Sequence, residues 1–185
     1  MIDAGDLKKG IAIELDGVLY QIIDWQHIKI ARGSAQVRLK LRDIRGGHTI
    51  ERTFSAGDRF KQVRLEQRPA QYLYQDGNLH YFMDTESFEQ TALTSEHLGD
   101  ALNYLKEGTT VTMSRHGDEA IGIDMPITVE LVVTETGPSY KGDTSQAGTK
   151  PAVLETGVTI QVPYFISTGD TIRVDTRYGS YVERA

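Results

Sequence analysis

The sequence predicts an all-β protein built from three small β-barrel domains. Apolar residues come in short runs that alternate with polar residues, as in half-buried strands, and Gly-containing turns separate these runs. Helical periodicity is confined to one stretch, residues 95–107. Short strands joined by frequent Gly turns are typical of barrels. The turns and the charge distribution divide the chain into residues 1–64, 65–127 and 128–185.

Residues 1–64 are predicted to form a barrel of SH3-like size. Asp16-Gly17 is a strong signal for a two-residue hairpin turn. Two further Gly-containing segments, residues 45–48 and 56–58, mark later turns. The predicted strands are residues 11–15, 18–28, 36–44 and 49–54.

The strand predicted at residues 36–44 alternates between aliphatic and cationic side chains. A period of two places the aliphatic residues on a buried face and the cations on a solvent face. The aliphatic residues are Val37, Leu39 and Leu41, and the cations are Arg38, Lys40 and Arg42.

A hairpin tip of mostly small residues, 29–35, precedes this strand. Gly33 permits positive φ, and Arg32 is left as the long cation at the apex. From residue 28 to residue 45 the only acid is Asp43, and the cations are Lys29, Arg32, Arg38, Lys40, Arg42 and Arg45. A basic stripe along one hairpin predicts contact with a phosphate backbone. The alternative is that Arg32 is a solvated residue that keeps a turn soluble.

Residues 65–127 have the element order of an OB-type barrel, with three strands, one helix and two more strands. Thr94 is the expected N-cap of a helix over 95–107, and Gly108 the residue that ends it. The predicted strands are residues 70–74, 79–84, 88–93, 111–114 and 120–123. Aromatic residues gather here, and we expect barrel core rather than a base-stacking surface; they are Tyr72, Tyr74, Tyr81 and Phe82.

Residues 128–185 are predicted to form a second barrel of OB size. Residues 125–127 are expected to be a hinge before it, and the polar stretch 137–148 a mobile loop. The predicted strands are residues 129–135, 158–162, 171–175 and 181–182.

Composition and charge limit the classes of function. The chain has no Cys, and its five His are not at metal-ligand spacing, so we expect no metal site, no cofactor and no thiol chemistry. No catalytic motif is present, and we expect a protein that is not an enzyme. The net charge is +4 over residues 1–64, −8 over 65–127 and −2 over 128–185, which suggests that the first part faces a polyanion. Neither a signal peptide nor a membrane-spanning run is recognisable, and we expect a cytoplasmic protein.

The segment 150–170 resembles the C-terminal signature of bacterial elongation factor P. Each fixed position of the signature is matched, in order, by Lys150, Ala152, Gly157, Val162-Pro163, Ile166 and Gly169. The resemblance extends over essentially the whole chain. Further matching residues are Tyr20, Gln26-His27-Ile28-Lys29, Gln71-Tyr72-Leu73-Tyr74, Phe82-Met83-Asp84, Gly142-Asp143-Thr144, Val174-Asp175-Thr176-Arg177, Tyr181 and Arg184.

The resemblance implies an SH3/KOW-like N-terminal barrel followed by two OB-fold barrels, in an L-shaped arrangement like that of tRNA. It implies a monomeric translation elongation factor that binds both ribosomal subunits between the P and E sites, beside peptidyl-tRNA. Such factors relieve stalling at consecutive prolines. Arg32 falls at the position of the functional Lys or Arg of the family.

The resemblance also assigns contacts to particular residues. The loop with Gly142, Asp143 and Thr144 would face the E-site codon on the small subunit, and Tyr181 and Arg184 would make C-terminal contacts. The implied tRNA and rRNA contacts of the hairpin are Lys29, Gly33, Ser34, Arg38, Lys40 and Arg42.

The tip departs from the family pattern, since Ile30-Ala31 stands where many members have Pro-Gly. Some relatives modify a lysine at this position, which an arginine excludes. One subgroup of the family instead glycosylates an arginine here. An enzyme that modifies Arg32 is therefore a further partner to test. Two alternatives stay open, namely the elongation factor P-like paralogue and a general RNA-binding barrel protein.

Overall fold

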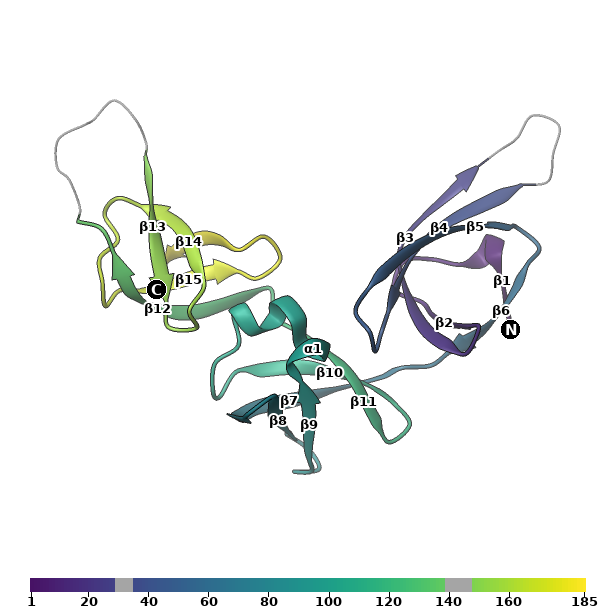
Figure 1. Ribbon diagram of the computed structural model, residues 1–185, viewed down its shortest axis with the longest axis horizontal. Helices are drawn as coiled ribbons and strands as arrows, with labels where there is room; N and C mark the ends of the chain where they lie inside the picture. Colours follow the sequence, from purple (N-terminus) through teal and green to yellow (C-terminus); the bar gives the residue numbers. More distant parts are fainter. Residues whose placement is uncertain (29–34, 139–147) are drawn as a thin grey trace. The chain divides into compact units, whose positions relative to one another are not determined.

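The computed structural model describes residues 1–28, 35–138 and 148–185, which form three β-sheets of six, five and five strands (Figure 1). The predicted all-β class is confirmed. The chain forms two compact units, one of residues 1–68 with 113–122 and one of residues 69–112 with 123–185.

The first sheet curls around its own core, with the spatial order β1-β6-β2-β3-β4-β5. The strands are Ile2–Asp3 (β1), Ala12–Leu15 (β2), Val18–Ile28 (β3), Gln36–Asp43 (β4), Thr49–Ser55 (β5) and Arg59–Val63 (β6), with a 3-10 turn at Ala4–Asp6 (η1). Asp16 and Gly17 join β2 to β3 with φ values of 52° and 79°. Two successive positive φ angles are those of a type I′ turn, so the predicted two-residue hairpin is confirmed.

The alternation predicted for β4 is also confirmed. Its burial changes at each residue, with the aliphatic side chains buried and the cations exposed. Val37, Leu39 and Leu41 pack in one core with Ile13 and Ile22, and all five are fully buried. Because this core holds the inner face of β4, the three cations of the strand are fixed on the outer face.

The second sheet has the order β11-β10-β7-β8-β9. Its strands are Glu66–Asp76 (β7), Leu79–Asp84 (β8), Gln90–Thr94 (β9), Thr110–His116 (β10) and Glu119–Asp124 (β11). Between β9 and β10 lie a short helix, Ser95–Leu98 (α1), and a 3-10 turn, Gly99–Asn103 (η2). The predicted succession of three strands, a helix and two strands is therefore present.

The helix expected over residues 95–107 is much shorter than predicted. Thr94 is its N-cap, as expected, because the Thr94 Oγ1 accepts a hydrogen bond from the His97 N–H at 3.4 Å. Gly99 ends it with a φ of 51°, a positive value that glycine adopts without a steric penalty. Gly108 does not cap this helix, and instead donates its N–H to the Tyr72 carbonyl at 2.8 Å.

The third sheet has the order β14-β13-β12-β15-β16. Its strands are Thr128–Thr136 (β12), Thr149–Leu154 (β13), Thr159–Pro163 (β14), Thr171–Asp175 (β15) and Ser180–Arg184 (β16). β13 was not predicted, because Pro151 interrupts a strand pattern. β1 and β6 were also not predicted.

The hinge expected at residues 125–127 lies inside the second compact unit and is held there by hydrogen bonds. Thr176 donates its Oγ1–H to the Pro126 carbonyl at 2.7 Å and its N–H to the Ile127 carbonyl at 2.9 Å. Tyr104, which follows η2, packs against the core of the third sheet. These contacts hold residues 126–127 and Tyr104 against the third sheet within the second compact unit.

Candidate nucleic-acid interface

The paired strands β3 and β4 form an arm that leads to the hairpin tip (Figure 1). Their pairing extends to Ile28 opposite Gln36, the last residues of the two strands. The register shifts between Ile22 and Asp24, so one residue of β3 is bulged out of the ladder. A bulge of this kind changes which face the following side chains occupy.

Three cations of β4 are exposed on the outer face of this arm, as the alternation requires. In the register of β4 with β5, Lys40 lies opposite Glu51, and in the register with β3 it lies opposite Asp24. Arg38 forms an ion pair with Glu51, with 3.5 Å between the Arg38 Nε and the Glu51 Oε1. The outer face of the arm is therefore cationic but partly neutralised.

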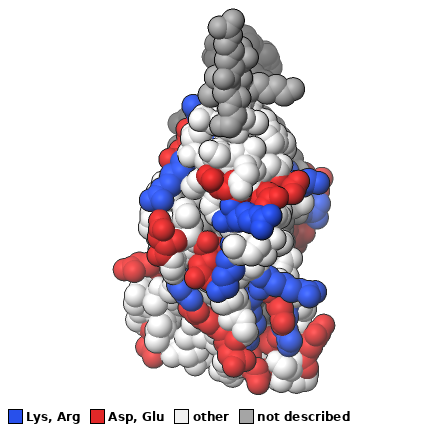
Figure 2. Space-filling model, turned by 90° about the vertical axis from the view of Figure 1, so that its right-hand side faces the viewer, with Lys and Arg blue, Asp and Glu red and all other residues white. Residues whose placement is uncertain are grey.

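Sequence reasoning missed this neutralisation. The count of charges over residues 28–45 included neither Asp24 nor Glu51, because both lie on neighbouring strands outside that window. Over the whole side of the molecule seen in Figure 2, blue Lys and Arg side chains lie beside red Asp and Glu side chains. Strand pairing was the signal that would have found it.

Seven of the site residues named from the sequence lie outside the described residues. In the hairpin tip these are Lys29, Arg32, Gly33 and Ser34, and in the polar loop they are Gly142, Asp143 and Thr144. The assignments made to them remain predictions.

The flanks of the polar loop are described, and both are held by specific contacts. Lys150 is buried, and its Nζ donates to the Gly137 carbonyl at 2.6 Å. The Tyr164 ring lies so close to Gly148 that a Cβ on this glycine would overlap the ring. Sequence reasoning assigned Lys150 only to the signature and did not foresee that it binds the main chain at the start of the loop.

The C-terminal residues named from the sequence lie on β16. Tyr181 is half-buried against the core of the third sheet, whereas Arg184 is exposed, with its Nη1 at 3.9 Å from the Asp170 Oδ2. In the preceding turn, the Arg177 guanidinium donates to both carboxylate oxygens of Asp175, at 3.1 and 2.7 Å. These hydrogen bonds hold the pKa of the Asp175 carboxyl below its usual value.

The aromatic residues of the second sheet divide between core and surface. Tyr72 and Phe82 are buried, as expected for barrel core, but Tyr74 is exposed and stacks on Tyr81 with 4.7 Å between ring centroids. Burial lowers the pKa of His80, whose ring nitrogens contact the Tyr72 hydroxyl at 3.1 Å and the Ser95 hydroxyl at 2.9 Å. This buried polar chain joins β7, β8 and α1.

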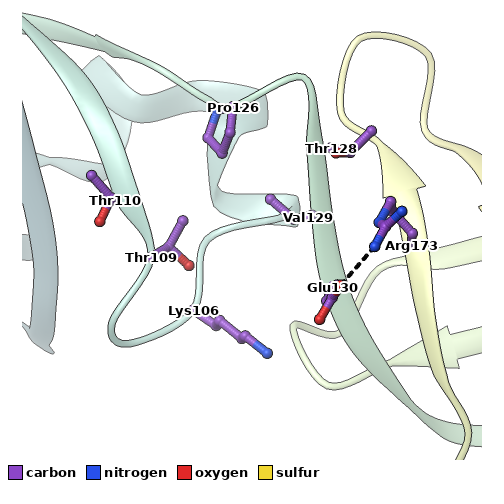
Figure 3. A pocket seen from close by; sticks show the side chains of 8 residues that line it. All are labelled: Lys106, Thr109, Thr110, Pro126, Thr128, Val129, Glu130 and Arg173. Atoms are coloured by element: carbon purple, nitrogen blue, oxygen red, sulfur yellow. Dashed lines mark hydrogen bonds and ion pairs between the residues drawn. The ribbon is translucent and has the colours of Figure 1, made fainter. Parts of the chain in front are cut away.

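A crevice of about 380 Å³ lies between the second and third sheets, within the second compact unit (Figure 3). Its lining residues are Lys106, Thr109, Thr110, Pro126, Thr128, Val129, Glu130 and Arg173. Its charged groups already have partners, because Lys106 pairs with Glu155 at 3.2 Å and Arg173 pairs with Glu130 at 3.0 Å. The crevice therefore offers no unpaired charge with which to recognise a ligand.

Within residues 1–28, 35–138 and 148–185, no cluster of three or more His, Asp or Glu side chains is arranged to hold a metal ion. No helix in the same part of the chain is long and apolar enough to cross a membrane.

Comparison with known proteins links all three sheets to one family. The elongation factor P KOW-like domain matches residues 3–60, the elongation factor P OB domain matches residues 65–123, and the elongation factor P C-terminal domain matches residues 129–184.

Full-length relatives give the same result. Elongation factor P of Moorella thermoacetica is 51% identical over 185 residues, and that of Acetivibrio thermocellus is 50% identical over 184 residues; each comparison covers 100% of both chains. Among solved structures, eukaryotic translation initiation factor 5A from Methanococcus jannaschii has a similar fold, with a TM-score of 0.52 and 24% identity over 67% of this chain and 91% of that chain. Since the three domain matches follow one another along the chain and relatives align with it from end to end, the chain belongs to the elongation factor P family of translation factors.

Proposed function

We propose that this protein binds the ribosome between the P and E sites beside peptidyl-tRNA and stimulates peptide-bond formation, which relieves stalling at consecutive prolines. The observation that carries the proposal is full-length membership of the elongation factor P family, together with Arg32 at the family's functional position. The exposed cations on the arm that leads to Arg32 support it, because phosphate backbones bind such surfaces.

In this proposal the protein acts as a cytoplasmic monomer and contacts both ribosomal subunits. Arg32 lies nearest the peptidyl-transferase centre, while Gly142, Asp143 and Thr144 face the E-site codon. Further contacts to tRNA and rRNA come from the hairpin, and Tyr181 and Arg184 supply C-terminal contacts. The hairpin residues are Lys29, Gly33, Ser34, Arg38, Lys40 and Arg42.

The proposed mechanism is positioning rather than chemical catalysis by this chain. The rigid ring of proline misaligns the reacting groups, so prolyl-tRNA is a poor donor and acceptor. A factor that holds the acceptor end of tRNA restricts it to the geometry of attack, and positioning alone lowers a barrier by several kcal/mol. No residue of this chain then has to transfer a proton, and the ribosome remains the catalyst.

The test is a polyproline translation reporter in a strain that lacks the native factor. Arg32→Ala should slow translation through the polyproline segment and spare a proline-free control. Its free energy of unfolding should change by no more than about 0.5 kcal/mol, as for exposed surface sites in general. Arg64→Ala, which removes an exposed arginine outside the arm, is the matched control and should behave like the native protein.

Arg32→Lys separates charge from arginine-specific chemistry, because lysine keeps the charge but loses the planar fork and any sugar attachment to arginine. Intact-mass measurement on protein from its native host determines whether Arg32 is modified. A normal polyproline rate for Arg32→Ala would refute the proposal that this tip acts at the peptidyl-transferase centre.

A further inference from the structure

Two aromatic rings lie next to each other on β3, close to the end of the arm. Trp25 is the single tryptophan of the chain. Its ring and the ring of His27 meet edge to face, with 4.8 Å between centroids and 83° between planes. Trp25 is 37% exposed, and His27 is also exposed. Tryptophan is highly buried on average, and more than a third of Trp25 is left accessible to a partner.

The β-bulge places this pair on a defined face of the arm. Ile22 lies opposite Leu41, and after the bulge Trp25 lies opposite Leu39 and His27 opposite Val37. Without the extra residue, Trp25 would occupy the outer face, because side chains of a regular strand alternate with a period of two. Bulges often aim a side chain in this way next to functional sites.

The two faces of the arm therefore differ in chemistry. Arg38 and Lys40 lie opposite Gln26 and Asp24, on the face that Trp25 and His27 do not occupy. One face thus presents cations, and the other, which also carries the buried Leu39 and Val37, leaves the aromatic pair partly accessible. An element of this kind fits between two parts of a folded RNA, where phosphates lie on one side and an unpaired base lies on the other.

Trp25 is only partly covered where it lies. It is opposite Leu39, which is fully buried, yet 37% of Trp25 itself remains exposed. Base stacking on exposed aromatic side chains is the contact by which proteins hold single-stranded nucleic acid, and it tolerates any base because each base has a π-face.

We propose that Trp25, supported by His27, stacks on an unpaired nucleobase from the single-stranded 3′ end of the tRNA beside which the factor binds. This inference rests on the proposed function and adds a second contact on the tRNA, separate from the one assigned to Arg32. Charge complementarity favours RNA over an apolar protein partner, since exposed cations line the other face of the same two strands.

The single tryptophan makes the site directly observable in the native, full-length protein. The probe is an RNA hairpin with a short unpaired 3′ end, and the control probe is the same hairpin with a blunt end. Stacking should quench the Trp25 fluorescence with the first RNA and leave it unchanged with the second. Equal quenching by both hairpins, or none by either, would overturn the inference.

The second measurement is binding to ribosomes that hold a tRNA in the P site. Trp25→Ala should bind about tenfold more weakly, in line with the loss of one base–aromatic stack. Trp25→Tyr keeps an aromatic ring and should recover most of the affinity. Phe88→Ala removes an exposed aromatic residue of the second compact unit and should bind like the native protein.

The outcomes separate this inference from the proposed function. If the native protein and Trp25→Ala bind tRNA-loaded ribosomes equally well, the stacking site is wrong and the proposed function stands. If Trp25→Ala loses affinity equally for vacant ribosomes, the base belongs to rRNA and the assignment to tRNA is overturned. If the native protein binds neither ribosome, both the proposed function and the stacking site are wrong.

Discussion

Neutralising Glu51 should strengthen the binding of RNA by the arm. Glu51 is the acid that pairs with Arg38, at 3.5 Å from the Arg38 Nε, and it also lies opposite Lys40 in the register of β4 and β5. Glu51→Gln keeps the size and shape of the side chain but removes its charge. Arg38 then becomes available to a phosphate without first giving up a carboxylate.

The expected magnitude follows from the exposure of the pair. The Arg38 and Glu51 side chains are 48% and 57% exposed, and ion pairs this exposed contribute only about 0.2–1 kcal/mol. Glu51→Gln should therefore lower the free energy of unfolding by less than about 1 kcal/mol. A phosphate contact that no longer competes with Glu51 regains the same free energy, which raises affinity up to about fivefold.

The assay is binding to ribosomes loaded with P-site tRNA over a series of salt concentrations. The gain should be largest at low salt, and the slope of log affinity against log salt should become steeper by about 0.7–0.9 if one more phosphate is neutralised. Glu66→Gln is the matched control, because Glu66 pairs with Arg68 at the same 3.5 Å and with similar exposure, but outside the arm. This variant should leave the binding unchanged.

Unchanged or weaker binding of Glu51→Gln at low salt, with the fold intact, would refute the reasoning. It would mean that the outer face of β4 does not meet a phosphate backbone. An equal gain in Glu51→Gln and Glu66→Gln would show that net charge alone, rather than the arm, determines the affinity.

Two further predictions concern stability. Burial lowers the pKa of His80 in the folded state, so the unfolded chain binds a proton more readily than the folded chain. The free energy of unfolding should therefore be highest above about pH 6.5 and fall by up to about 1.4 kcal/mol per pH unit below it. Denaturant titrations at pH 7.5 and 5.5 should show a smaller fall for His80→Gln than for the native protein. Gly179→Ala should lower the free energy of unfolding by about 1–3 kcal/mol, because Gly179 has a φ of 64° and a Cβ there would lie 2.5 Å from the Tyr104 hydroxyl. Gly157→Ala is the control and should be destabilised less, because Gly157 has a φ of 89° but a Cβ there would have no neighbour within 4 Å. Equal urea midpoints for the two variants would contradict this prediction.

Local patterns predicted a large part of the fold. The type I′ turn at Asp16-Gly17 depends on the φ preferences of two adjacent residues, and the faces of β4 depend on alternation within one strand. Both signals lie within a few residues of each other, so the sequence alone was sufficient. Recognition of the family signature around Val162-Pro163 then identified the family before any tertiary structure was known.

Features that depend on residues far apart in the sequence were not predictable in this way. The partial neutralisation of Arg38 depends on the register of β4 with β5, and the inward face of Trp25 depends on the bulge in β3. These contacts are specified by strand pairing, which periodicity does not reveal. The early end of the α-helix is a different kind of miss, because Gly99 lies inside the predicted helix and its φ of 51° ends the α-helix locally although the apolar periodicity continues.

The rate of Pro–Pro bond formation in a reconstituted translation system tests the central claim most directly. The full-length protein is added to ribosomes that carry a peptidyl-prolyl-tRNA and receive prolyl-tRNA, with a proline-free message as the control. We expect the rate on the polyproline message to rise with protein concentration and then saturate, while the rate on the control message stays constant. Equal acceleration of both messages, or of neither, would contradict the account of this chain as a factor that positions prolyl-tRNA.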